Sequence, residues 1–152
     1  MAVLHLMCGV PGAGKTTRAK ELATLIPAVR LTPDEWLLQM TDGCNSNDVR
    51  HAVETVQWEI AARVLGLGVD VILENGFRTR CQRDEFRARA AALGAMTKVH
   101  FMDAPFDELL RRLAFRNTQR DSGNFEVTEE QLTFFLSDLE PPTQDEMDLD
   151  SV

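Results

Sequence analysis

The chain has few cysteines and no long apolar run. Its three cysteines, Cys8, Cys44 and Cys81, form an odd set without C-x-x-C spacing. This pattern indicates neither a disulfide framework nor a zinc site, so we expect reduced thiols in a cytoplasmic protein. Every apolar run is far shorter than the roughly 18 residues that a membrane-spanning helix requires. We therefore expect no membrane partner and, because no basic segment with a cleavage site precedes the first apolar run, no secretory signal.

Basic residues are missing from the last part of the chain. Residues 121–152 contain ten acidic side chains and no Lys or Arg, whereas residues 1–120 contain 16 basic and 14 acidic side chains. The formal net charge of −8 is therefore concentrated toward the C-terminal end. A basic zone at residues 78–120 holds ten basic against five acidic side chains. Such a zone is compatible with binding a phosphate group, and also with solvated helix faces.

One glycine-rich segment carries a specific chemistry. Residues 9–17 read G-V-P-G-A-G-K-T-T and match the phosphate-binding pattern G-x-x-x-x-G-K-[ST]. Glycines let backbone N–H groups approach phosphate oxygens, and Lys15 places a positive charge on the β- and γ-phosphates. The Thr16 hydroxyl can join the coordination shell of Mg²⁺. The residues predicted to bind a nucleoside triphosphate are Gly9, Pro11, Gly12, Ala13, Gly14, Lys15, Thr16 and Thr17.

Short apolar segments alternate with helical patterns along the chain. Strands are expected at residues 3–8, 28–31, 69–73 and 98–102. Helices are expected to begin near residues 18, 33, 47, 79, 105 and 128. This alternation is typical of βαβ units, which form a parallel sheet with helices on both faces. The sequence therefore predicts an α/β fold in three layers.

Capping residues and apolar spacing indicate where the helices lie. Thr79 with Gln82, and Thr128 with Gln131, each match a capping box at a helix start. Asn47 is expected to cap a long helix that ends near residue 66. The apolar stripe predicted for that helix consists of Val49, Val53, Val56, Ile60 and Val64.

Polar side chains follow two of the predicted strands. Asp34 comes shortly after the second strand, and Glu74 and Asn75 directly follow the third. Ligands of such sheets bind at the carboxyl ends of the strands, so we expect these residues to share a site with the glycine-rich loop. His5 and His100 lie inside predicted strands and are interpreted as packed residues rather than ligands.

Several classes of phosphate-binding protein lack support in the sequence. A GTPase would show an Asn-Lys-x-Asp guanine reader, and a transport ATPase a longer chain with an L-S-G-G-Q-like signature; neither is present. Ring-forming ATPases need a larger domain than 152 residues provide. A small phosphotransferase with an arginine-bearing lid fits this length.

The order of the motifs also resembles a family. G-V-P-G-A-G-K-T-T, L-T-P-D-E-W, V-I-L-E-N-G-F-R-T-R-C-Q-R, L-R-R-L-A-F-R-N, F-E-V-T-E-E-Q-L and E-P-P-T-Q-D-E follow one another as in small P-loop kinases. These AAA-domain proteins are of the zeta toxin and polynucleotide kinase type, with chloramphenicol phosphotransferase as a relative. The resemblance spans residues 3–146 and implies a P-loop NTPase fold with four to five parallel strands. It implies one domain at 1–146 with a lid at about 112–125, followed by an acidic tail at 147–152.

The resemblance also implies roles for individual residues. Asp34 corresponds to the acid that accepts the proton of the substrate hydroxyl, although a helix-start acid stabilised by the helix dipole would look the same. Lys15, Arg112 and Arg116 would complete the catalytic set by neutralising the transferred phosphoryl group. Glu74 is expected to act with Thr16 at the metal, unless it contacts substrate or only caps its strand. Arg78 and Arg83 are expected to contact substrate, together with Asp34.

These features predict an ATP- and Mg²⁺-dependent kinase. Its acceptor is predicted to be a hydroxyl group of a small molecule, with a 5′-hydroxyl end of a nucleic acid as the main alternative. A non-catalytic ATP-binding switch is a further alternative, and a toxin acting on a nucleotide-sugar is a special case of the first. We expect a monomer or a weak homodimer.

Overall fold

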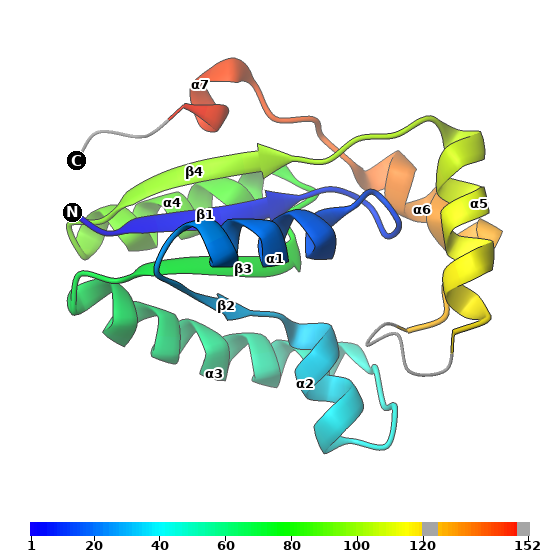
Figure 1. Ribbon diagram of the computed structural model, residues 1–152, viewed down its shortest axis with the longest axis horizontal. Coiled ribbons are helices and arrows are strands. Elements are labelled where there is room, and N and C mark those ends of the chain that lie inside the picture. Colours follow the sequence, from blue (N-terminus) through cyan, green and yellow to red (C-terminus); the bar gives the residue numbers. More distant parts are fainter. Residues whose placement is uncertain (120–124, 149–152) are drawn as a thin grey trace.

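The computed structural model describes residues 1–119 and 125–148, which form four parallel strands and seven helices. The strands are β1 (Val3–Cys8), β2 (Ala28–Leu31), β3 (Asp70–Gly76) and β4 (Met96–Phe101). They form one sheet in the order β2–β3–β1–β4, and every neighbouring pair is parallel. All four predicted strands are confirmed, so their carboxyl ends lie at one edge of the sheet (Figure 1).

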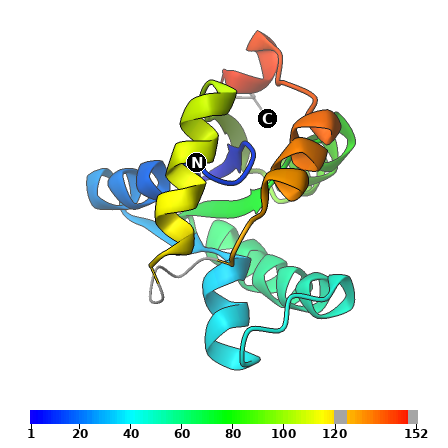
Figure 2. The ribbon, with the colours of Figure 1, turned by 90° about the vertical axis from the view of Figure 1, so that its right-hand side faces the viewer.

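Helices cover both faces of the sheet, as the sequence predicted. They are α1 (Lys15–Leu25), α2 (Pro33–Met40), α3 (Asn47–Gly66), α4 (Arg80–Ala92), α5 (Phe106–Asn117), α6 (Glu129–Asp138) and α7 (Gln144–Met147). Helix α1 lies on one face, and α3 and α4 lie on the other (Figure 2). Helices α5 and α6 lie beyond the carboxyl ends of the strands, and α2 lies at the same end (Figure 1). The α/β P-loop fold is therefore confirmed.

Strand β1 is central because both of its faces are covered. Leu4 is fully buried in a cluster that includes Ala61 of α3 and Ala90 of α4. Met7 points to the opposite face and packs in a cluster with Ala19 of α1. Successive side chains of a strand alternate between faces, so a nearly continuous apolar run is what a strand covered on both sides requires. This burial fixes the position of the loop that follows β1.

Both predicted capping boxes are present. The backbone N–H of Gln82 donates to Thr79 Oγ1 over 3.3 Å, and that of Gln131 donates to Thr128 Oγ1 over 3.2 Å. In each pair the side-chain oxygen of the glutamine accepts a hydrogen bond from the backbone N–H of the threonine. These reciprocal bonds fix the first turns of α4 and α6.

The apolar stripe predicted for α3 is wrong in its details. The helix is capped by Ser46 rather than Asn47, and Val56 and Ile60 are 47% and 37% exposed. The buried positions repeat at every fourth residue, as Val53, Gln57, Ala61 and Leu65. The helix therefore packs along one i, i+4 ridge, which places Val56 and Ile60 beside the contact rather than within it. Gln57 is buried although neither of its amide side-chain atoms has a partner among the described residues.

The sequence predicted four or five strands. The described residues contain four strands, and helix α7 follows α6 where a fifth strand would have been expected. Helix α7 packs against β4 (Figure 1). Parts of two predicted segments lie outside the described residues, namely 120–124 of the lid and 149–152 of the acidic tail.

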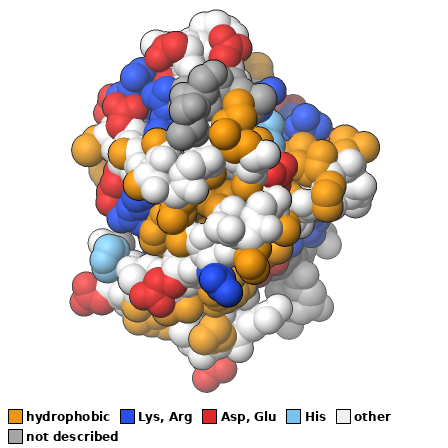
Figure 3. All heavy atoms as spheres, turned by 90° about the vertical axis from the view of Figure 1, so that its left-hand side faces the viewer, with side chains coloured by type: hydrophobic (Ala, Val, Ile, Leu, Met, Phe, Trp, Pro, Cys, Tyr) orange, Lys and Arg blue, Asp and Glu red, His pale blue; other side chains and the backbone are white. Residues whose placement is uncertain are grey.

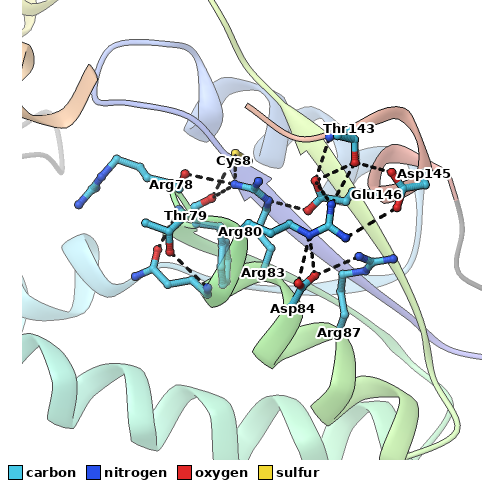
Figure 4. Close-up of polar contacts among 12 residues, drawn as sticks. Cys8, Arg78, Thr79, Arg80, Arg83, Asp84, Arg87, Thr143, Asp145 and Glu146 are labelled. Carbon is cyan, nitrogen blue, oxygen red and sulfur yellow. Dashed lines mark hydrogen bonds and ion pairs between the residues drawn. The ribbon is translucent and has the colours of Figure 1, made fainter. Parts of the chain in front are cut away.

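A buried ion pair attaches α7 to the rest of the fold (Figure 4). Arg83 Nε donates to Glu146 Oε1 over 2.8 Å, and both side chains are almost fully buried. Arg83 Nη1 also donates to the carbonyl oxygens of Phe77 at 2.9 Å and Arg78 at 3.2 Å. Glu146 Oε2 accepts a hydrogen bond from Thr143 N at 2.8 Å. The pair therefore joins α7, α4 and the turn that follows β3.

The position of Arg83 corrects the prediction that it binds substrate. Its exposed fraction is 0%, and its guanidinium is engaged by Glu146 and by backbone carbonyls. A guanidinium buried in this way is out of reach of a molecule bound at the surface. The partner that neutralises it lies 63 residues further along the chain, so local sequence gave no sign of the pairing.

The opposite end of the molecule, where the strands begin, has a mixed surface. Hydrophobic side chains are interspersed there with acidic and basic ones (Figure 3). Within residues 1–119 and 125–148, no helix combines the length and the apolar character needed to cross a bilayer.

Candidate active site

A cleft of about 1250 Å³ opens at the carboxyl ends of the strands. The loop between β1 and α1 contributes to its lining together with residues of α2, α3, α4, α5, α6 and the turn after β3. All of the predicted site residues line this cleft except Gly9 and the buried Arg83. The structure thus brings together predicted site residues that are up to 105 positions apart, from Pro11 to Arg116.

Glycines give the loop its shape. A Cβ at Gly9 would lie 2.7 Å from the carbonyl oxygen of Met102, so a larger residue does not fit there. Gly14 has a φ of 106°, a conformation that glycine adopts readily, and it immediately precedes α1. No side chain caps α1, so the backbone N–H groups of its first turn are available to an anion.

Lys15 is folded back onto the loop. Its Nζ donates to the carbonyl oxygens of Gly9 at 2.8 Å and Val10 at 2.9 Å. Burial lowers the pKa of the Lys15 ammonium to about 8, and the carboxylate of Asp34 acts in the opposite direction. Phosphate oxygens are stronger acceptors for an ammonium than carbonyl oxygens are. The ammonium that ties the loop together is therefore also placed to bind a phosphate group.

Thr16 and Glu74 are joined directly. Thr16 Oγ1 donates to Glu74 Oε1 over 2.7 Å, and Arg30 forms ion pairs with both Glu74 and Glu35. Because its proton is directed to Glu74, the Thr16 hydroxyl keeps lone pairs for a cation. No group of three His, Cys, Asp or Glu side chains in the described part of the chain could hold a metal ion. An Mg²⁺ ion at Thr16 would therefore also need oxygen ligands from the nucleotide, as is usual for this ion.

Asp34 lies in the first turn of α2 and is partly exposed to the cleft. Its carboxylate forms an ion pair with Arg50 of α3. Arg50 Nε also donates to Asn45 Oδ1 over 3.0 Å, and its Nη1 lies 4.0 Å from Glu54 Oε1. Arg50 was not predicted from the sequence, because no motif connects two residues on different helices 16 positions apart.

Arg112 and Arg116 both line the cleft and both belong to α5. Arg112 Nη1 donates to the carbonyl oxygen of Gly12 over 3.2 Å. Arg116 Nη2 donates to Phe125 O over 3.4 Å, while its Nε is buried and has no hydrogen-bond partner among the described residues. Burial lowers the pKa of Arg116, and the charge of Asp34 opposes this effect. Arg116 therefore has an N–H group that an anion could engage.

Arg78 extends from the turn after β3. Its guanidinium lies 4.3 Å from the centre of the Phe135 ring, and its Nε is 3.4 Å from Asp138 Oδ2. In the same turn Gly76 and Phe77 have φ values of 90° and 45°, and Gly76 O accepts a hydrogen bond from Gly9 N at 3.0 Å. The turn thus connects the glycine-rich loop to the wall of the cleft.

The P-loop and Asp34 both lie within a segment that matches a known family. A family model described as an AAA domain aligns with residues 4–142. The chain belongs to this AAA-domain family. No curated protein matches the sequence. The AAA-domain assignment agrees with the resemblance seen in the motifs.

Solved structures share the fold of this AAA-domain protein at low sequence identity. A chain of the Pnkp1/Rnl/Hen1 RNA repair complex has a TM-score of 0.77 and 19% identity, covering 91% of this chain and 44% of its own length. A putative kinase from Chloroflexus aurantiacus has a TM-score of 0.74 and 22% identity, with coverages of 94% and 83%. Kti12 of Chaetomium thermophilum, solved with ADP-AlF3, has a TM-score of 0.69 and 18% identity, with coverages of 92% and 81%. The chain therefore has the fold of small P-loop kinases and spans less than half of the repair-complex chain.

Proposed function

We propose that this AAA-domain protein is an ATP- and Mg²⁺-dependent phosphotransferase that moves the γ-phosphoryl group to a hydroxyl group of a small molecule. The observation that carries the proposal is that Asp34 lines the same cleft as Lys15 and Arg116. It is close enough for its charge to oppose the lowering of the pKa of both cations by burial. A phosphate-binding loop, an available arginine and a carboxylate at one cleft are the groups that phosphoryl transfer uses.

The proposed reaction assigns one task to each side chain. The acceptor oxygen bonds to the γ-phosphorus while the bond from that phosphorus to the bridging oxygen of ADP breaks. The proton of the acceptor hydroxyl passes to Asp34, whose carboxylate also orients that hydroxyl. Lys15, Arg112 and Arg116 neutralise negative charge on the transferred group.

The metal would be held by Thr16 together with the phosphates of the nucleotide. When bound, Mg²⁺ would supply positive charge that neutralises the phosphates of the nucleotide. Glu74 accepts a hydrogen bond from the Thr16 hydroxyl and so orients that oxygen, while Arg30 forms an ion pair with Glu74. Glu74 therefore acts on the metal through Thr16 in this proposal.

Two alternatives are supported by specific observations. A 5′-hydroxyl end of a nucleic acid is an alternative acceptor, because one similar solved chain belongs to an RNA repair complex. A non-catalytic nucleotide-dependent switch would use Asp34 only to join α2 to α3 through Arg50. The net charge of −8 favours a small acceptor over a long polyanion.

The proposal is tested by measuring transfer from γ-³²P-ATP with Mg²⁺ to a metabolite pool and to a 5′-hydroxyl oligonucleotide. The wild type is compared with Asp34→Asn and with Asp42→Asn, which changes an exposed acid outside the cleft lining. We expect Asp34→Asn to reduce transfer by about 10²- to 10⁴-fold while ATP still binds, and Asp42→Asn to have little effect. Slow phosphate release that is equal in all three proteins, without labelled acceptor, would favour the switch.

A further inference from the structure

A small side chamber of about 30 Å³ adjoins the main cleft. Three polar residues line both spaces, namely Glu54, Asn75 and Gln82, and two phenylalanines complete the chamber. A cavity needs a volume of about 10–15 Å³ to hold one water molecule, so the chamber has room for one or two oxygen-sized groups. It can therefore hold one hydroxyl or hydroxymethyl group of a ligand whose remainder lies in the main cleft.

The polar groups of the chamber offer carboxylate and amide oxygens as hydrogen-bond acceptors and amide NH₂ groups as donors. Asn75 Oδ1 is buried and has no partner among the described residues. Glu54 contributes a carboxylate whose pKa is raised by burial, an effect that the charge of Arg50 opposes. Gln82 Oε1 is used by the backbone N–H of Thr79, so the donors of the set are the amide NH₂ groups of Gln82 and Asn75. These groups match a ligand that brings hydroxyl protons.

The walls of the chamber are aromatic and rigid. Phe77 is buried, and its ring packs edge-on against Phe86 with 5.0 Å between ring centres. Phe86 in turn packs edge-on against Trp58 at 5.4 Å. Aromatic walls next to polar acceptors suit a compound with both C–H faces and hydroxyl groups.

The charges around the chamber disfavour an anionic group. None of the five residues that line it is basic. Two guanidinium groups whose charge acts on Glu54 are both engaged, that of Arg50 by Asp34 and Asn45 and that of Arg78 by Asp138. A phosphate or carboxylate in the chamber would face Glu54 without a free cation, which is costly in a partly buried site.

Arg50 also relates the chamber to Asp34. Its guanidinium forms an ion pair with Asp34 and lies 4.0 Å from Glu54. Both carboxylates are thus within reach of a single guanidinium. A molecule that presents one hydroxyl to Asp34 can therefore place a second hydroxyl near Glu54 if it has the dimensions of a small polyol.

We propose that the acceptor is an uncharged polyhydroxyl compound of sugar size, with one hydroxyl held by Glu54 and Asn75 in the side chamber and another presented to Asp34. This inference rests on the proposed phosphotransferase function, because it assigns the acceptor of that reaction. It adds Glu54, Asn75 and Gln82 as residues that determine specificity.

The test measures binding by titration calorimetry in the presence of Mg²⁺ and a non-hydrolysable ATP analogue. The uncharged probes are D-glucose, D-ribose and myo-inositol, and the charged probes are D-gluconate, glucose 6-phosphate, ribose 5-phosphate and a 5′-hydroxyl oligonucleotide. The variants are Glu54→Gln and Asn75→Ala, with Glu59→Gln as a matched control because Glu59 is exposed on the same helix.

We expect at least one uncharged probe to bind more tightly than its charged counterpart. Its affinity should fall by about 10- to 100-fold in Glu54→Gln and by about 2- to 10-fold in Asn75→Ala, with Glu59→Gln unchanged. The inference is overturned if no uncharged probe binds, if a charged probe binds better, or if neither chamber variant alters binding. Measurement of γ-³²P transfer to the same probes then separates the two proposals. If a polyol binds in a way that depends on Glu54 but receives no phosphoryl group, only the phosphotransferase function is refuted. If a phosphate-bearing acceptor receives the phosphoryl group and Glu54→Gln does not change that transfer, only this inference is refuted.

Discussion

The two sides of the cleft are built in different ways. The nucleotide side is contributed mainly by one continuous segment, residues 9–17, held between a buried strand and the first helix. The proposed acceptor side is assembled from α2, α3, the turn after β3 and α4, and its residues extend from Asp34 to Gln82. The first is therefore determined by local backbone geometry, whereas the second depends on contacts between distant segments. Changes to long-range contacts should affect the acceptor side more than the nucleotide side.

The largest expected effect follows from removing the carboxylate that neutralises the buried Arg83. We expect Glu146→Ala to lower the free energy of unfolding by about 3–5 kcal/mol, because an unpaired guanidinium would remain in the interior. Urea denaturation measures this loss. In protein that remains folded, acceptor affinity should decrease more than ATP affinity, since Arg83 also holds the carbonyl oxygens of Phe77 and Arg78.

Two further variants serve as controls for Glu146→Ala. Asp145→Ala removes a neighbouring acid that is largely exposed and should change stability little. Combining Arg83→Met with Glu146→Leu removes both charges and should recover much of the lost stability. An equal loss of ATP and acceptor affinity in Glu146→Ala would show that the two sides of the cleft are not supported independently.

A smaller effect is expected from the arginine with an unpartnered N–H group. Arg116→Ala should reduce the transfer rate constant by about 10²- to 10³-fold, because it removes a cation from the transferred phosphoryl group. Single-turnover measurements with γ-³²P-ATP report this rate. Arg111→Ala is the control, since Arg111 is exposed on the same helix and pairs with Glu108. Equal rates for the two variants would remove Arg116 from the catalytic set.

The smallest effect concerns a pair of histidines on the sheet, which do not line the cleft. His5 Nδ1 and His100 Nε2 are 2.9 Å apart, and burial together with the charge of His5 lowers the pKa of His100 to about 4. The unfolded chain takes up a proton at His100 near pH 6.5, whereas the folded protein does so only near pH 4. Stability should therefore fall as the pH decreases from about 6.5 to 4.

This pH effect should change the stability of the sheet without changing ligand binding at the cleft. Urea denaturation at several pH values should show a smaller acid-dependent loss in His100→Gln than in the wild type, with His51→Gln as an exposed control. ATP affinity should be the same in His100→Gln and the wild type at pH 7. An unchanged pH profile of stability in His100→Gln would contradict the linkage.

The features that the sequence predicted are those that depend on nearby residues. The four strands, the P-loop and the capping boxes at Thr79 and Thr128 each require only a short stretch of chain. The family model adds the order of these elements. The gathering of Asp34 and Glu74 beside the glycine-rich loop could be predicted because the carboxyl ends of parallel strands share an edge, whereas Arg116 was predicted only from the family resemblance.

The features that the sequence did not predict depend on tertiary contacts. Nothing near Arg83 indicates that Glu146 would bury it, and nothing near Asp34 indicates Arg50 as its partner. The burial of Gln57 in place of Val56 likewise reflects which ridge of α3 meets the sheet. Apolar spacing alone does not determine that choice, because it records periodicity and not the direction in which a helix crosses its neighbours.

The ion pair between Arg83 and Glu146 also has a consequence for the order of events during translation. Glu146 is made 63 residues after Arg83 and after all four strands have been synthesised. At a translation rate of about 5–20 residues per second, the interval between the synthesis of Arg83 and that of Glu146 is about 3–13 s. During that interval burial of Arg83 is unfavourable, so the turn after β3 cannot adopt its final packing. The nascent chain should therefore acquire a nucleotide-binding loop before it acquires a complete acceptor site.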